Sequence, residues 1–261
     1  MGGLRELIGI LAIGLIAGLG LPGCGGSSPP PTRSPQDVAS QLSENDASLR
    51  SAIDAWRAGG DPPSAPPPQE VLHRARALQS LTRDLAVDPK LANRVISLVP
   101  PPLGLELSRL SSAEHDLLRL SRGARSRQLE VGAPPPLADL IGFYHEADRR
   151  FGVGWNYLAA IHLVETEFGR VKSNSVAGAQ GPMQFIPSTW AVYGHGGDIH
   201  DPHAAILAAA RLLQANGAPA RYAPALRAYN PSGLYVDAVS RYAQQIAQDP
   251  YAIYYLYCWR P

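Results

Sequence analysis

Residues 155–169 read WNYLAAIHLVETEFG, an apolar segment that runs directly into two glutamates. Residues 157–164 are rich in alanine and leucine, a composition that favours a buried helix over a strand. Glu165 follows directly, so its carboxyl emerges at an apolar helix end. Burial there would disfavour the charged form and raise the pKa of Glu165 toward about 6, which keeps a proton available near neutral pH. A glutamate that merely lies on the surface explains the periodicity equally well, so the neighbouring motifs must decide.

The rest of the chain has the same helical character. Hydrophobic residues make up 45% and aromatic residues 7% of the 261 residues, and alanine and leucine recur at helical spacing with few strand-like alternations. The sequence therefore predicts an all-α protein. The formal net charge of +1 does not supply the positive field that nucleic acid binding needs, so nucleic acid is excluded as a partner.

A second motif follows the helix. Residues 175–190 read SVAGAQGPMQFIPSTW, and a Tyr229-Asn230 pair comes later. Taken with Glu165, these motifs resemble the lytic transglycosylases related to goose-type lysozyme, over roughly residues 137–248. Two positions depart from that family's pattern: Thr166 stands where many members have serine, and Pro182 lies inside the Gly-x-Met-Gln motif.

The resemblance implies a lysozyme-like helical catalytic domain that acts on peptidoglycan glycan strands. Glu165 would protonate the oxygen between N-acetylmuramic acid and N-acetylglucosamine, and would then take the proton of the muramyl 6-hydroxyl as a 1,6-anhydro ring closes. Two further catalytic residues are implied: Ser175 would hold the substrate acetamido group, and Tyr229 would hydrogen-bond near Glu165 and orient it. The substrate-binding residues that it implies are Gly181, Met183, Gln184 and Asn230.

The residue types fit these roles, with one reservation. Gly178 and Gly181 can admit a sugar ring or another backbone at close range, because glycine has no Cβ. The amide of Gln184 can both donate to and accept from sugar groups. The side chains of Met183 and Phe185 could contact sugar faces, but core packing is the simpler interpretation.

Two alternative functions stay open, whereas a second catalytic acid and a metal site are not expected. Water could replace the 6-hydroxyl, which would make the enzyme a hydrolase, and an inert lipoprotein that only binds glycan is a third alternative. Glu167 is the nearest second acid, but residues i and i+2 of a helix do not share a face. His195, Asp198, His200 and His203 match no zinc motif, so neither a metal nor a cofactor is expected.

The N-terminal segment predicts export and a lipid anchor. Arg5 precedes an apolar run over residues 7–21, which is too short to cross a bilayer and has the length of a signal-peptide core. The run ends in Leu21-Pro22-Gly23-Cys24, which resembles a bacterial lipobox with Cys24 as the lipidated residue, although an ordinary signal peptide would also fit. We expect a signal peptide over residues 1–24, a flexible tether over 25–34, and attachment to the membrane of the cell envelope.

The remaining boundaries follow from proline-rich breaks. Residues 35–133 predict a helical region of unknown role: a helical hairpin, a helix that starts at Asp88-Pro89 and is stopped by Pro100-Pro101-Pro102, and a further helix over 105–120. The catalytic domain is predicted over residues 134–250 and an aromatic C-terminal tail over 251–261. Cys258 in this tail is expected to be a lone thiol packed among aromatic rings.

Overall fold

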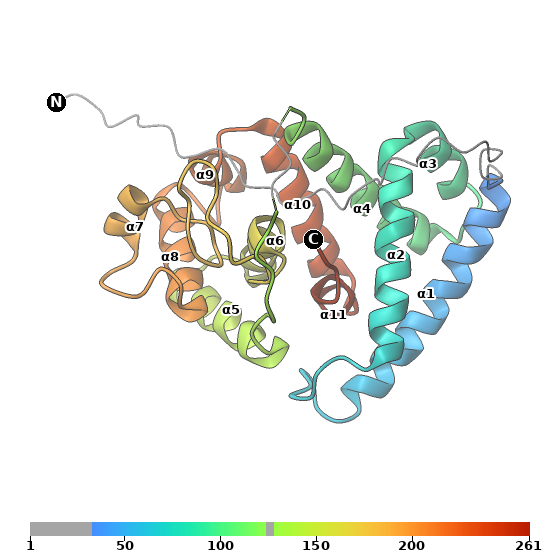
Figure 1. Cartoon of the computed structure of the whole chain (residues 1–261), viewed down its shortest axis with the longest axis horizontal. Coiled ribbons are helices and arrows are strands. Elements are labelled where there is room, and N and C mark those ends of the chain that lie inside the picture. The colour runs from blue at the N-terminus through green and yellow to red at the C-terminus, as the bar shows by residue number, and fades with distance from the viewer. Residues whose placement is uncertain (1–32, 124–127) are drawn as a thin grey trace.

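The computed structural model describes residues 33–123 and 128–261. Over these ranges the chain forms eleven helices, and β-pairing is limited to two isolated bridges. The all-α prediction is confirmed (Figure 1). Among the described residues, no helix combines the length and the apolar character needed to cross a membrane. The expected signal peptide, Cys24 and most of the tether lie outside the described residues.

Four helices form the N-terminal helical region: α1 (Pro35–Arg57), α2 (Gln69–Val87), α3 (Pro89–Ile96) and α4 (Pro101–Leu120). Helices α1 and α2 pack against each other as the expected hairpin. Ser34 caps α1 in a capping box with Asp37, and the Asp88 carboxylate caps α3 through the N–H groups of Lys90 and Leu91, both at 3.0 Å.

One expectation about this region is wrong. Helix α3 ends at Ile96, before the proline run 100–102, as expected, but the next helix does not wait until Leu105, because Pro101 is the first residue of α4. Proline lacks an N–H, but the N–H groups of the first helical turn have no partner inside the helix, so proline is well tolerated there. The helix therefore begins four residues before the predicted start at 105.

Seven helices follow: α5 (Leu137–Phe151), α6 (Trp155–Thr166), α7 (Pro187–Tyr193), α8 (Pro202–Ala215), α9 (Tyr222–Tyr229), α10 (Gly233–Gln248) and α11 (Ala252–Tyr257). Helix α6 is the central one and contacts α5, α8, α10 and α11. Nine of its residues, 158–166, are buried, which agrees with the buried helix that its composition predicts.

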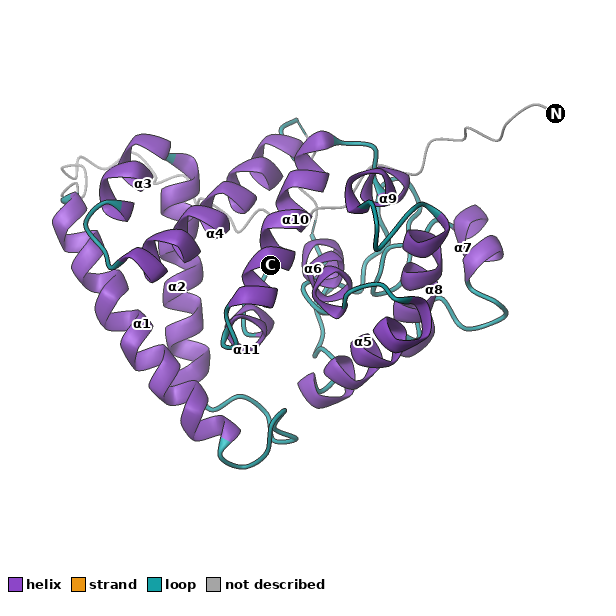
Figure 2. Cartoon of the chain, turned by 180° about the vertical axis from the view of Figure 1, so that it is seen from behind, coloured by secondary structure: helices purple, strands orange, loops and turns teal. Residues whose placement is uncertain are grey.

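The N-terminal helices pack directly on the rest of the molecule. Helix α4 lies along α10, and α2 and α1 contact α11. Figures 1 and 2 show α10 and α11 between the N-terminal helices on one side and α5 to α9 on the other. A polar tie accompanies the apolar packing, because Arg50 on α1 bonds Glu106 on α4 at 2.7 Å and Asp249 at 3.0 Å. One hydrophobic core thus continues from α1 to α11.

Candidate active site

The last turn of α6 presents Glu165. The helix ends at Thr166. Its C-cap residue Glu167 has a left-handed backbone with φ of 49°, and Phe168 follows with φ of 60°. Non-glycine residues rarely adopt this conformation, and two in succession make a sharp stop. The N–H groups of Glu167 and Phe168 donate to the carbonyls of Leu163 and His162, so the turn is closed by backbone hydrogen bonds.

Glu165 is buried at this helix end. The residue is only 6% exposed, and its carboxyl accepts one hydrogen bond, from the Tyr235 hydroxyl to Oε1 at 2.8 Å. Burial raises the pKa of Glu165 to about 8, and the hydrogen bond from Tyr235 opposes this in part. The carboxyl therefore retains its proton at neutral pH, as a general acid requires. Glu165 is therefore a buried acid and not the surface glutamate that the helix pattern allowed equally well, and its pKa lies above the value of about 6 expected from the sequence.

The orienting tyrosine differs from the expected one. Tyr229, assigned to Glu165 by the resemblance, instead donates its hydroxyl to the carbonyl of Met183 at 2.6 Å. Tyr235, on α10, makes the direct bond to Glu165. The rings of the two tyrosines stack, with centroids 6.4 Å apart and planes 7° from parallel. Tyr229, on α9, thus contacts the ring of Tyr235 and the loop that carries Met183. The hydrogen bond to Glu165 comes from Tyr235 on α10.

His162 lies one helical turn before Glu165 and is no acid or base partner for it. Its ring is fully buried and its Nδ1 is 2.7 Å from the Tyr144 hydroxyl. Burial lowers the pKa of His162 to about 3, so the ring is neutral at physiological pH. The histidine acts in packing, against the ring of Phe168.

The loop of residues 175–186 is held by its own hydrogen bonds. Ser175 accepts the N–H of Ala179 on its Oγ at 2.9 Å, and Gln180 and Phe185 exchange two backbone hydrogen bonds. Gly181 has φ of 72°, and a Cβ there would lie 1.9 Å from the carbonyl oxygen of Ile199. Glycine is thus required at 181 for the approach of another backbone, one of the two uses foreseen for it.

The proposed substrate residues of this loop behave differently from one another. Met183 is fully buried, which agrees with core packing, the simpler of the two interpretations of its side chain. Gln184 is left-handed, with φ of 49°, and its Nε2 donates to the Gly181 carbonyl at 2.9 Å. Its Oε1 is buried and has no hydrogen-bond partner among the described residues, so an acceptor remains free for a ligand.

Asn230 and His203 both have hydrogen-bond partners within the fold. Asn230 is buried, and its Oδ1 accepts the N–H of Ser232 at 3.0 Å, which shapes the entry to α10. His203 bonds Glu146 at 2.8 Å and its ring lies 4.6 Å from that of Phe143. Both residues therefore already take part in local contacts of the fold.

Thr166 joins α6, which carries Glu165 and is called the catalytic helix below, to the loop of residues 175–186, called the motif loop. Its hydroxyl donates to the carbonyl of Pro182 at 2.6 Å and accepts the N–H of Gly169 at 2.9 Å. Sequence reasoning noted Thr166 only as a departure from serine and missed this role. A hydroxyl at 166 is the signal that could have found it, since either serine or threonine provides one.

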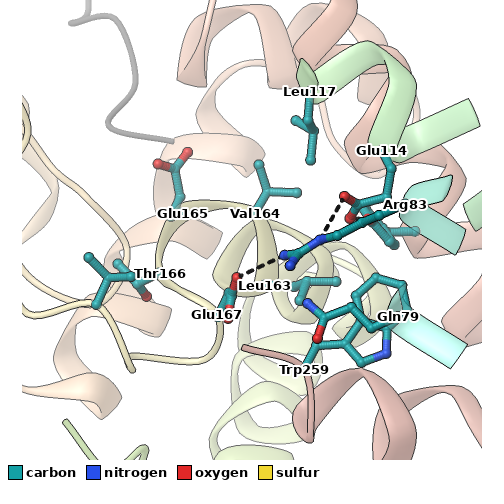
Figure 3. A pocket seen from close by; sticks show the side chains of 12 residues that line it. Gln79, Arg83, Glu114, Leu117, Leu163, Val164, Glu165, Thr166, Glu167 and Trp259 are labelled. Carbon is teal, nitrogen blue, oxygen red and sulfur yellow. Dashed lines mark hydrogen bonds and ion pairs between the residues drawn. The ribbon is translucent and has the colours of Figure 1, made fainter. Parts of the chain in front are cut away.

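Glu167 faces away from Glu165, as the i, i+2 argument predicts. Figure 3 shows Glu167 pointing toward Arg83 of α2, while Glu165 points away from that arginine. Arg83 lies 3.9 Å from Glu167 and 3.7 Å from Glu114. Burial raises the pKa of Glu167 to about 8, and Arg83 opposes this.

Cys258 is buried among the aromatic residues of the tail, as predicted. Burial raises the pKa of its thiol to about 12, which leaves it unreactive at neutral pH.

Comparison with known proteins agrees with this geometry. Residues 143–251 match the family model described as the transglycosylase SLT domain. Neither the curated proteins nor the solved structures contain a match to the chain. The matched residues include α6, the motif loop, and Tyr229 and Tyr235, and the family acts on peptidoglycan. Residues 143–251 are thus similar to the transglycosylase SLT domain, and this similarity supports a lytic transglycosylase.

Proposed function

We propose that the protein cleaves the β-1,4 bond between N-acetylmuramic acid and N-acetylglucosamine and leaves 1,6-anhydro ends, with Glu165 as its single catalytic carboxyl. The observation that carries the proposal is the burial of Glu165 beneath the hydroxyl of Tyr235. A pKa of about 8 supplies the proton for the leaving oxygen. The same carboxylate then accepts the proton of the muramyl 6-hydroxyl.

The arrangement of carboxyls supports substrate assistance. Retaining and inverting glycosidases normally use two carboxyls that flank the bond, about 5 to 10 Å apart. The neighbouring acid, Glu167, is directed toward Arg83 and away from Glu165 (Figure 3). In the proposed reaction the 2-acetamido carbonyl of the substrate stabilises the cation that develops at the anomeric carbon, in place of a second carboxylate.

The motif loop would bind the acetamido-bearing sugar. Ser175 accepts a backbone N–H, so its own hydroxyl proton remains for a carbonyl oxygen of the substrate. Gln184 offers its unpaired Oε1 to a hydroxyl or an acetamido N–H. These two groups, with Glu165, are the polar contacts that we assign to the substrate.

The predicted anchor completes the proposal. The sequence Leu21-Pro22-Gly23-Cys24 supports lipid attachment at Cys24, and hence a place at the membrane facing the cell wall. We expect the exported chain to partition into the detergent phase and a Cys24→Ser variant to remain in the aqueous phase. Equal partitioning of the two proteins would contradict the anchor.

The reaction is tested by mass spectrometry of the muropeptides that the full chain releases from purified peptidoglycan. We expect products lighter than reducing muropeptides by one water, absent with Glu165→Gln and present with Glu44→Gln, an exposed glutamate on α1. Reducing ends would identify a hydrolase instead. No release by the wild-type chain would favour a protein that only binds glycan, and full activity of Glu165→Gln would refute the assignment of the catalytic residue.

A further inference from the structure

A buried polar cluster lies behind the catalytic helix and draws on four distant parts of the chain. Arg83 comes from α2, Glu114 from α4, Glu167 from the end of α6, and Tyr242 from α10. These side chains line one pocket together with Glu165, and Figure 3 shows Arg83 between the two other carboxyls. The cluster is thus built jointly by the N-terminal helical region and the SLT domain.

Arg83 is the centre of this cluster. Its guanidinium lies 3.7 Å from Glu114 and 3.9 Å from Glu167, and it donates to the carbonyl of Arg260 at 3.1 Å. Gln79, one turn earlier on α2, exchanges two hydrogen bonds with the backbone of Arg260, at 2.8 and 3.1 Å. The contacts of Arg83 with the two carboxyls are longer than hydrogen bonds, whereas its contact with the Arg260 carbonyl is a hydrogen bond. A guanidinium is planar and carries five N–H donors, so it can face all three groups at once, whereas lysine offers one compact ammonium.

The turn that Arg83 contacts is the one that ends the catalytic helix. Glu167 is two residues beyond Glu165, and its left-handed backbone must be kept in place by contacts outside the turn. On one side Thr166 fixes the turn to the carbonyl of Pro182. On the other side Arg83 is the contact that α2 makes with the carboxyl of Glu167.

We propose that Arg83 is a positioning residue for Glu165, through which the N-terminal helical region fixes the end of the catalytic helix. The inference rests on the proposed function and gives that region a role in catalysis. Arg83 does not touch the substrate in this proposal. It acts through Glu167, whose position sets the direction of the carboxyl two residues earlier.

The charged groups around Glu167 agree with a positioning contact between Arg83 and its carboxyl. Burial raises the pKa of both Glu167 and Glu114, and Arg83 opposes this at each. Arg170 also lowers the pKa of Glu167, and the Tyr242 hydroxyl bonds Glu114. One guanidinium therefore faces two buried carboxyls. With a pKa of about 8, Glu167 is mostly protonated at neutral pH, so its contact with Arg83 is a polar one, and removal of Arg83 would leave both carboxyls without that polar neighbour.

The test combines kinetics with backbone exchange in the full chain. Arg83→Met is compared with Arg74→Met, which removes an exposed pair with Glu70 on the same helix. We expect kcat on peptidoglycan to fall about tenfold with Arg83→Met while KM changes little, because a displaced acid slows the chemical step more than binding. Arg74→Met should keep the kcat of the wild type, and Arg83→Lys should recover only part of the loss.

Hydrogen exchange of the amides of Glu167 and Phe168 tests the same proposal without activity. We expect exchange to be about tenfold faster in Arg83→Met than in Arg74→Met, because the turn opens more often. If Arg83→Met does not fold, Arg83→Met with Glu167→Gln removes the unpaired carboxyl and should fold, yet keep the low kcat. A kcat within twofold of the wild type in the variant that folds, or unchanged exchange at this turn, would overturn the proposal. Wild-type protein that releases no product would refute the proposed function, while exchange would still decide the role of Arg83.

Discussion

Replacing Glu165 by glutamine should stabilise the folded protein at alkaline pH. Burial raises the pKa of Glu165 from 4.5 to about 8. A raised carboxyl pKa means that the folded state holds its proton more tightly than the unfolded state does. The contribution to stability is complete below about pH 4.5 and is lost as the pH rises through about 8.

The size of the effect follows from that shift. Each unit corresponds to about 1.4 kcal/mol, so the shift sets an upper limit of about 5 kcal/mol at pH 8 and above. Glutamine cannot ionise, and its carbonyl can still accept the hydroxyl of Tyr235. We therefore expect Glu165→Gln and the wild type to be equally stable near pH 4.5, and the variant to be more stable by several kcal/mol near pH 8.5.

Urea unfolding followed by tryptophan fluorescence measures this difference at each pH. Glu167 and Glu114 titrate in both proteins, so their contributions cancel in the comparison. Glu44→Gln, at an exposed position, should follow the wild type at every pH. If Glu165→Gln and the wild type were equally stable at pH 8.5, the burial of an acid at this helix end would not be what raises its pKa.

Three further substitutions test neighbouring contacts. Tyr235→Phe removes the hydrogen bond that lowers the pKa of Glu165, so the alkaline limb of the pH profile of kcat/KM should move to higher pH, and kcat should fall at least about tenfold. Gly181→Ala places a Cβ 1.9 Å from the carbonyl oxygen of Ile199 at a positive φ, and should lower the free energy of unfolding by about 3 kcal/mol or more in urea titration. Thr166→Val leaves a buried carbonyl unpaired and should lower the thermal midpoint, at a loss of about 1 to 3 kcal/mol, whereas Thr166→Ser should not.

Much of the fold could be predicted from local signals. The Asp88-Pro89 and Asp201-Pro202 pairs each place a capping carboxylate before a proline, and α3 and α8 begin at those prolines. The apolar run before Glu165 predicted a buried helix, and α6 is that helix. These features depend on residues close together in the chain, so no tertiary information was needed.

The missing parts of the site depend on contacts between distant residues. Tyr235 was not singled out because only the packing of α10 on α6 brings it to Glu165. Arg83 is one of several arginines on α2, and nothing in its local pattern separates it from Arg74, which lies in an exposed pair. The burial of Met183 likewise results from the surrounding core, because its position in the motif is compatible with either role.

The contact between the first and the last helices has a consequence for how fast the chain reaches its native state. Arg50 on α1 and Asp249 beside α11 are 199 positions apart, and the core passes between them without a break. To form such a long-range contact, the chain must first lose the conformational entropy of closing a large loop, and only then do the contacts stabilise it. Folding is therefore slower than for a bundle of sequential helices. We therefore expect a slow refolding phase in which α6 has formed but Trp259 is still exposed. The intermediate in this phase exposes part of the hydrophobic core and is liable to aggregate.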